Sequence, residues 1–409
     1  MAVTKLDVYI QFSKQEKLIG QLILDGRSIL FKYSDAYLET GKNLSPNQLK
    51  FDDNPQTTKE KVFNGLFGVF ADSLPDAWGY LLIKKRLSAD RIAIESLNAL
   101  DHLTFSGKNS MGALQYRPSV ELEQEAVEIN LDILNDNISE VLSGESSVVI
   151  DDMFGRGGSP GGARPKIYAG YNPKTDSLIS GISNLPAAYE HWIIKFAADV
   201  DSKDIANIEL AYYKMALDSG IEMSECRVFK SDTGTSYFGT KRFDRIGNDK
   251  LHMLSAAGLL HDDYEHSTLD YGNLIYQAKK LTNNAQAAEQ MFRRTVFNIL
   301  SHNRDDHSKN FAFLMNPKGV WSLAPAYDLT FSSSSQGYHS TSCAGNYVDP
   351  GREELLELAN ELSINKAKAT IYEIKGIVDR WRIYAELSGV SESSIKTIET
   401  SLKTIRSRF

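Results

Sequence analysis

The chain has 409 residues, of which 42% are apolar and 24% are charged, which predicts a soluble globular protein of two or three domains. The net charge of −8 argues against a surface that attracts nucleic acid or membranes as a whole. The two cysteines cannot build a disulfide framework, the N-terminus lacks a secretory signal pattern, and no apolar run could span a membrane. We therefore expect a cytoplasmic protein.

The N-terminal part predicts a small sheet followed by helices. Residues 5–40 alternate between apolar and polar positions, which is typical of strands with one buried face. From Val62 onward the apolar spacing becomes helical, and Ser73 or Asp76 could cap the helix. Residues 103–119 indicate a glycine-containing turn and a closing strand. Between Arg117 and Arg156 there are ten acidic residues and no basic ones, which predicts an exposed surface helix and a linker near 119–150.

The rest of the chain changes from strands to helices. Strands are predicted at 166–172, 191–198 and 236–246, with a helix at about 204–219 that ends at Gly220. After about residue 250 the pattern is mostly helical, apart from one hairpin near 311–328. Its turn is NPKG (316–319), which has proline at the second position and glycine at the fourth.

Two segments of the middle part could contact phosphate groups. The loop GRGGSPGGARPK (155–166) holds five glycines in eight residues, so its backbone N–H groups could approach phosphate oxygens closely, although a flexible surface loop is an equal alternative. Lys195 lies inside the apolar strand HWIIKF and must either reach solvent or pair with an anion such as a nucleotide phosphate. Glu209, fourteen residues later on a helix, is a possible partner, as in protein kinases.

The segment SHNRDDHSKNFAFLM (301–315) contains the main catalytic candidates. Asp305 and Asn310 have the Asp-x-x-x-x-Asn spacing of kinase catalytic loops, and Lys309 could neutralise a transferred phosphoryl group. The predicted hairpin would bring Asp328 back beside Asn310, which gives two oxygen ligands for a magnesium ion. A metal hydrolase built on the neighbouring histidines is an alternative, but no His-x-x-x-His pair supports it.

These motifs, in this order, resemble one known family. SPGGARPK, WIIKF, KRFDR, NRDDHSKNFAF and PAYDL, together with DSLPDAWGYLL and GKNSMGALQY, resemble the HipA-like serine/threonine kinases, the toxin components of HipBA-type toxin–antitoxin systems. The resemblance implies an α+β fold that is kinase-like, two-lobed and related to lipid kinases. It implies an extra N-terminal α/β subdomain (1–118), an ATP-binding α/β lobe (119–245) and an all-helical C-terminal lobe (246–409) that carries the catalytic loop and the metal-binding hairpin.

The resemblance also implies a role for each matching residue. Asp305 would be the catalytic base, His307 and Lys309 would contact phosphate or substrate, and Asn310 and Asp328 would bind Mg²⁺. ATP would contact Lys195, Lys241, Phe243, Gly161, Gly162, Ala163, Lys166 and Tyr327. Ser159 would be the autophosphorylated serine. Lys241 stands where many members have an acidic residue, which leaves any side-chain role there in doubt.

The implied function is an ATP-dependent kinase that arrests growth by phosphorylating a translation component such as an aminoacyl-tRNA synthetase. The implied partners are a helix-turn-helix antitoxin of HipB type and, mainly through it, operator DNA, with no membrane contact. Two alternatives are a small-molecule phosphotransferase of kinase-like fold and an ATP-sensing module of a DNA complex. The intact set of Asp305, Asn310 and Asp328 argues against the second of these.

Overall fold

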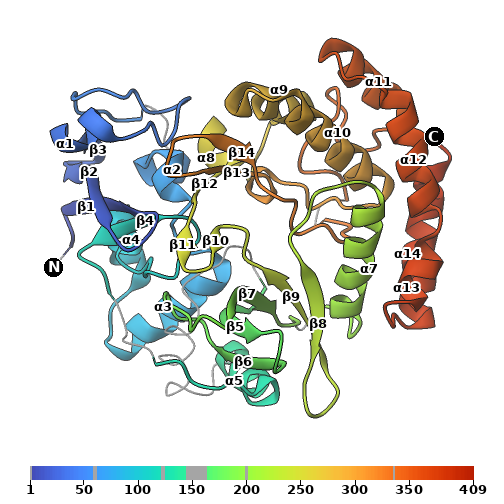
Figure 1. Ribbon diagram of the computed structural model, residues 1–409, viewed down its shortest axis with the longest axis horizontal. Helices are drawn as coiled ribbons and strands as arrows, with labels where there is room; N and C mark the ends of the chain where they lie inside the picture. The colour runs from blue at the N-terminus through green and yellow to red at the C-terminus, as the bar shows by residue number, and fades with distance from the viewer. Residues whose placement is uncertain (1, 59–61, 121–124, 144–163, 199–200, 335–336) are drawn as a thin grey trace.

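The computed structural model describes residues 2–58, 62–120, 125–143, 164–198, 201–334 and 337–409 (Figure 1). A sheet near the N-terminus lies on one side of the molecule, and helices near the C-terminus lie on the opposite side (Figure 1). A second sheet and a mainly helical region lie between them. No helix among the described residues is long and apolar enough to cross a membrane.

The N-terminal sheet is antiparallel, with its strands in the order β3-β2-β1-β4. The strands are β1 (Lys5–Gln11), β2 (Glu16–Asp25), β3 (Ser28–Tyr33) and β4 (Leu114–Arg117). Leu6, Val8 and Ile10 of β1 are buried, as the alternating pattern predicts. β4 pairs with β1, which confirms the predicted closing strand.

Short helices connect β3 to β4. They are α1 (Asp35–Thr40), η1 (Val62–Gly65), α2 (Gly68–Ala71), α3 (Ala77–Ala89), η2 (Ile94–Ser96) and α4 (Ala99–Leu103). Asp76, one of the two predicted caps, accepts a hydrogen bond from the Gly79 amide at 2.8 Å and begins α3.

The second sheet has five antiparallel strands in the order β6-β5-β7-β9-β8. The elements here are α5 (Leu131–Ser143), β5 (Lys166–Asn172), β6 (Ser177–Ser180), β7 (Glu190–Lys195), α7 (Ile205–Asp218), β8 (Cys226–Lys230) and β9 (Ser236–Lys241). The sequence predicted β5, β7, β9 and α7, but not β6 or β8. Helix α5 is present as predicted, but it is not merely a solvated surface helix. Its residues Leu131, Leu134, Ile138 and Val141 are buried in a core shared with this sheet.

The predicted strand at 236–246 is interrupted at Arg242, and a small hairpin of β10 (Arg245–Ile246) and β11 (Asp249–Lys250) follows. A three-stranded sheet comes next, with β12 (His252–Ser255), β13 (Ala312–Met315) and β14 (Trp321–Leu323) in the order β12-β13-β14. The predicted hairpin of β13 and β14 is confirmed, and its turn is closed by the Gly319 amide donating to the Asn316 carbonyl at 2.9 Å. β12 was not predicted.

Helices make up most of the remaining chain. They are α8 (Ala256–Leu260), α9 (Tyr271–Thr282), α10 (Ala285–Leu300), η3 (Ser308–Asn310), α11 (Arg352–Glu361), α12 (Ala367–Val378), α13 (Trp381–Glu386) and α14 (Glu392–Arg406). The mixed sheet and helix architecture confirms the predicted α+β class.

The hydrophobic cores do not follow the three predicted domains. The largest core joins the N-terminal sheet, α7 and the helical region, whereas Trp78, Leu82 and Ile83 of α3 pack into the core of the five-stranded sheet. Helices α2 and α8 approach so closely that a Cβ atom on Gly68 would lie 2.3 Å from the Gly258 carbonyl oxygen. The boundaries at 118 and 245 therefore stay predictions.

Candidate active site

Lys195 lies between two carboxylates. Its Nζ atom is 2.6 Å from Glu209 Oε2 on α7 and 2.6 Å from Asp328 Oδ1 on the segment after β14. Burial alone would lower the pKa of Lys195, but the charges of Asp328 and Glu209 outweigh burial and raise it. The predicted pairing of the strand lysine with the helix glutamate is therefore present in the structure.

Asp328 has two features expected of a functional carboxylate. Burial alone would raise its pKa, but Lys195 and Lys166 hold the pKa far below its usual range, so the group is ionised. Its backbone is left-handed, with φ at 53°, a conformation that costs a residue with a side chain some energy and that often marks functional positions. About a third of its side chain stays exposed.

Lys166 adds a second positive charge beside Lys195. The two lysines are direct cross-strand partners in the β5–β7 ladder, so their side chains leave the same face of the sheet. Burial lowers the pKa of Lys166, while the charge of Asp328 raises it in part. Two lysines placed opposite each other repel, which favours an anion in front of them.

Asp305 and Asp306 are neighbours with opposite environments. The Asp305 side chain is 54% exposed, and its Oδ1 atom lies 3.8 Å from His307 Nε2. Its carbonyl accepts a hydrogen bond from Asn310 Nδ2 at 2.7 Å, which closes the loop around η3. Asp305 therefore presents its carboxylate outward, as a group that must meet a substrate does.

Asp306 anchors the predicted catalytic loop. It is buried and accepts hydrogen bonds from Tyr271 Oη at 2.5 Å, His339 Nδ1 at 2.7 Å and the Ser340 amide at 2.7 Å. The metal-hydrolase alternative would use the histidines of this segment, His302 and His307. Of these, His302 contacts the Ser332 carbonyl through its Nδ1 atom at 3.1 Å. The sequence did not identify the anchoring role of Asp306, because its partners are far away along the chain.

The hairpin returns the chain to the catalytic loop, as predicted. Tyr327 Oη donates to the Lys309 carbonyl at 2.6 Å, which brings Asp328 next to the Lys309–Asn310 segment. The Lys309 side chain lies over the ring of Tyr264, with Nζ 4.2 Å from the ring centroid. His307 also packs against Tyr264, with the ring centroids 5.6 Å apart.

By the resemblance, the residues from Lys241 to Phe243, at the end of β9 and just after it, would form the hinge that binds adenine. The Lys241 amide donates to the Glu225 carbonyl at 2.8 Å, the Arg242 amide donates to the His191 carbonyl at 2.8 Å, and the Lys241 side chain pairs with Glu190 at 2.6 Å. The ring of Phe243 packs against Tyr327, with the ring centroids 5.3 Å apart.

A buried charge cluster holds this hinge segment against the N-terminal part. Arg242 binds Asp244 through two hydrogen bonds of 2.9 and 2.8 Å, and Arg245 also binds Asp244. Arg242 and Arg245 both donate to the Ser110 carbonyl, at 3.0 and 2.9 Å, and the Gly112 amide donates to Asp244 at 2.7 Å. Asp244 is fully buried, and the two arginines lower its pKa although burial alone would raise it.

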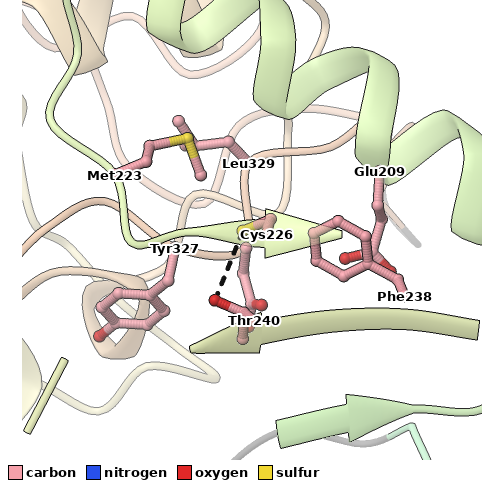
Figure 2. Close-up of a pocket in the computed structure, with 8 residues that line it drawn as sticks. Glu209, Met223, Cys226, Phe238, Thr240, Tyr327 and Leu329 are labelled. Carbon is pink, nitrogen blue, oxygen red and sulfur yellow. Dashed lines mark hydrogen bonds between the residues drawn. The ribbon is translucent and has the colours of Figure 1, made fainter. Parts of the chain in front are cut away.

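Figure 2 shows a small pocket beside Glu209, one of the two carboxylates that contact Lys195. Glu209 marks one end, and Thr240 lies 3.4 Å from the Cys226 sulfur in the middle (Figure 2). The pocket is lined by Glu209, Met223, Cys226, Phe238, Thr240, Tyr327, Asp328 and Leu329. The charged part of this lining consists of two carboxylates, Glu209 and Asp328, and most of the rest is apolar.

Some predicted site residues cannot be placed. Ser159, Gly161, Gly162 and Ala163 lie outside the described residues. Just after them, Arg164 binds Asp201 through hydrogen bonds of 2.8 to 3.0 Å.

Comparisons with known proteins agree with this architecture. The HipA N-terminal domain matches residues 7–117 and the HipA-like C-terminal domain matches residues 158–381, whereas no curated protein sequence matches the chain. The HipA structure from Shewanella oneidensis MR-1, solved with HipB and operator DNA, is 16% identical and aligns over 98% of this chain and 96% of that chain, with a TM-score of 0.68. The Helicobacter pylori kinase CtkA is 13% identical and aligns over 54% of this chain and 88% of that chain, with a TM-score of only 0.37. The chain has the fold of HipA, as predicted, and it belongs to the HipA-like family.

Proposed function

We propose that the protein is an ATP-dependent serine/threonine protein kinase. The observation that carries the proposal is the position of Lys195, which contacts Glu209 and Asp328 at 2.6 Å each, while Tyr327 ties the same segment to the catalytic loop. Lysine between a helix glutamate and a metal-binding aspartate is the arrangement that kinases use to hold ATP phosphates.

The described residues supply the groups that phosphoryl transfer needs. Lys195 and Lys166 would contact the phosphates of ATP. Asp305 would accept the proton of the substrate hydroxyl while that oxygen bonds to the γ-phosphorus, and the bond from the γ-phosphorus to the bridging oxygen breaks to release ADP. Lys309 would neutralise the phosphoryl oxygens after leaving the ring of Tyr264.

The site also fits a magnesium ion. Asn310 uses its Nδ2 atom on the Asp305 carbonyl, which leaves its amide oxygen for a metal. Asp328 uses Oδ1 on Lys195, which leaves Oδ2. Oxygen ligands of this kind, with waters and nucleotide phosphates, are what Mg²⁺ prefers. The bound ion would neutralise charge on the phosphates.

The adenine ring would bind at the hinge. The Lys241 and Arg242 amides already donate to backbone carbonyls, so we assign the adenine contact to the backbone of Phe243. The rings of Phe243 and Tyr327, which pack together, would border the base. The side chain of Lys241 would have no part in this contact because it pairs with Glu190.

The biological setting follows from membership of the family. The kinase would arrest growth in the cytoplasm by phosphorylating a translation component such as an aminoacyl-tRNA synthetase, and it would autophosphorylate at Ser159. A helix-turn-helix antitoxin of HipB type would be its partner and would bring it to operator DNA. The Shewanella structure, which contains HipB and operator DNA, supports such a partner.

Labelled ATP tests the proposal directly. The purified protein is incubated with ATP and magnesium, with and without cell lysate, and modified serines are identified by mass spectrometry, with Asp305→Ala as the matched control. Phosphate on a lysate protein that the control does not modify supports a protein kinase. ATP consumption with an aminoglycoside or a sugar instead would favour a small-molecule phosphotransferase, and ATP binding without any transfer would favour a sensing module.

A further inference from the structure

The cluster behind the hinge holds more positive charge than its one carboxylate balances. Arg242, Arg245 and Lys250 are 4%, 8% and 4% exposed, and Asp244 is fully buried and already binds both arginines. Among the described residues, the buried Nε atom of Arg245 has no hydrogen-bond partner. Buried charges are normally paired, so an excess of this size points to a missing anion.

Lys250 is the member for which no described carboxylate lies within ion-pair distance. Its Nζ atom donates to the Lys108 carbonyl at 2.9 Å. When the Gln115 amide is turned to satisfy its neighbours, its oxygen accepts from the same atom at 3.0 Å. Both are neutral acceptors. Burial, together with the charges of Arg245 and Arg242, lowers the pKa of Lys250 to about 7.

A polar pocket opens beside Lys250. Its lining residues come from the β1–β2 turn, from residues 108 and 183–184, and from the β10–β11 hairpin. The turn and the hairpin meet where the Lys250 amide donates to the Phe12 carbonyl at 2.6 Å. Its lining includes Lys14, Lys108, Ser183 and Asn248, which offer positive charge and hydrogen-bond donors. Glu16 and Asp249 also line it, but Glu16 is paired with Arg117.

We propose that this pocket binds a small oxyanion of the phosphate class, which Lys250 contacts and which balances the buried charge of Arg242 and Arg245. The donors are those that phosphate binding uses elsewhere, namely lysine ammonium groups, hydroxyls and side-chain amides. The site is separate from the nucleotide phosphates, which are assigned to Lys195 and Lys166, and it does not depend on the proposed kinase activity.

The test is the binding of sulfate, whose charge is constant near neutral pH, measured by isothermal titration calorimetry. Wild type should bind sulfate saturably at this pocket, and Lys250→Met should lose that component. Methionine is unbranched and only one atom shorter than lysine, and it removes a charge that is costly to bury, so the variant should fold. Binding of sulfate at the nucleotide site would be the same in wild type and in Lys250→Met. The difference between their titrations therefore reports sulfate binding at the proposed pocket alone. Lys368→Met, on α12, is the control and should bind as wild type does.

The pH dependence gives a second readout. The charged and titratable groups that act on Lys250 or line the pocket with it are Arg242, Arg245, Asp244, Glu16, Lys14, Lys108 and Asp249, and His191 lies beside the two arginines. Arginines and carboxylates do not titrate near neutral pH, and burial lowers the pKa of His191 to about 4, so that ring stays neutral. Protonated Lys250 is the binding form, so the affinity for sulfate should fall about 30-fold between about pH 6 and about pH 8.5.

Two further arms complete the experiment. Lys14→Met changes an exposed lysine of the pocket and cannot disturb the core, so it should weaken the same binding component even if Lys250→Met fails to fold. Inorganic phosphate and glycerol phosphate, compared at one pH, distinguish a free anion from a phosphate ester. The proposal is overturned if wild type shows no saturable component, or if the folded lysine variants bind sulfate as wild type does.

Discussion

Asp305 and Asp306 allow a prediction in which one residue serves as the control for its neighbour. Asp305→Ala should leave ATP binding nearly unchanged and lower phosphoryl transfer by roughly 10²–10⁴-fold, the contribution of a positioned general base. The side chain is 54% exposed, and its Oδ1 atom lies 3.8 Å from His307 Nε2. The hydrogen bond from Asn310 goes to the backbone carbonyl of Asp305 and survives the substitution. The free energy of unfolding should therefore change by no more than about 0.5 kcal/mol.

Asp306→Ala should behave in the opposite way. It removes a buried carboxylate that accepts hydrogen bonds from Tyr271, His339 and the Ser340 amide. Leaving these donors unsatisfied should cost about 3–5 kcal/mol of stability, as breaking a buried charged network does. Thermal stability, ATP affinity and transfer should then fall together, because the whole catalytic loop loses its anchor.

Three measurements on both variants decide the matter: the thermal unfolding midpoint, the ATP dissociation constant and the rate of phosphate transfer to a lysate protein. The expected pattern is a selective loss of transfer in Asp305→Ala and a combined loss in Asp306→Ala. Near wild-type transfer by Asp305→Ala would refute its assignment as the base. A loss of ATP affinity as large as its loss of transfer would show that the residue acts in binding instead.

Three other predictions concern the same site. Asp328→Asn should weaken the magnesium-dependent part of ATP binding, because a hard cation loses a charged ligand; a titration with and without magnesium that matches wild type would contradict this. Glu209→Gln should lower transfer by about 10- to 100-fold, equivalent to about 1.5–3 kcal/mol for a hydrogen bond to a charged group. The control is Asp379→Asn, which weakens ion pairs with Lys375 and Arg406 at the end of α12 and should change transfer little. After incubation with ATP, peptide mapping should find phosphate on Ser159, and the negative charge of that phosphate should lower the affinity for ATP. The variant Ser159→Ala should stay active. A phosphorylated form that binds ATP as before would rule out this switch.

The parts of the site that local spacing determines could be predicted from the sequence. A lysine inside an apolar strand requires an anion, and the nearby helix offers Glu209, so their ion pair could be anticipated. The NPKG turn sets the length of the hairpin, and that length decides where Asp328 arrives. In both cases the residues that meet are joined by a single turn or one short connection.

The missed features depend on residues that meet only in the folded chain. Asp306 and His339 are 33 residues apart, and Arg242 meets the Ser110 carbonyl across 132 residues. Strand β6, with the sequence SLIS, is too short to show an alternating pattern, and tertiary pairing with β5 decides its conformation. The acidic composition around α5 indicated a helix that is exposed to solvent, but a helix needs only one apolar face to pack on a sheet.

Helix α7, which carries Glu209, is held by many contacts, and this would limit where the proposed kinase can be regulated. Many protein kinases switch by moving the corresponding helix, which breaks the lysine–glutamate pair. Here Ile208, Tyr212 and Met215 are buried in the largest core, where burial of each is worth about 1.5–3 kcal/mol.

Polar contacts hold the same helix along its length. Tyr212 donates to the Ser301 carbonyl at 2.6 Å, Asn207 donates to the Gly389 carbonyl at 2.9 Å, and Lys214 donates to the Leu387 carbonyl at 3.1 Å. Moving α7 would break these bonds and expose its apolar face at the same time. Breaking the pair of Lys195 and Glu209 by moving α7 would therefore be costly. In the proposed kinase we expect a switch to act on ATP from another direction, which is where our proposal places Ser159.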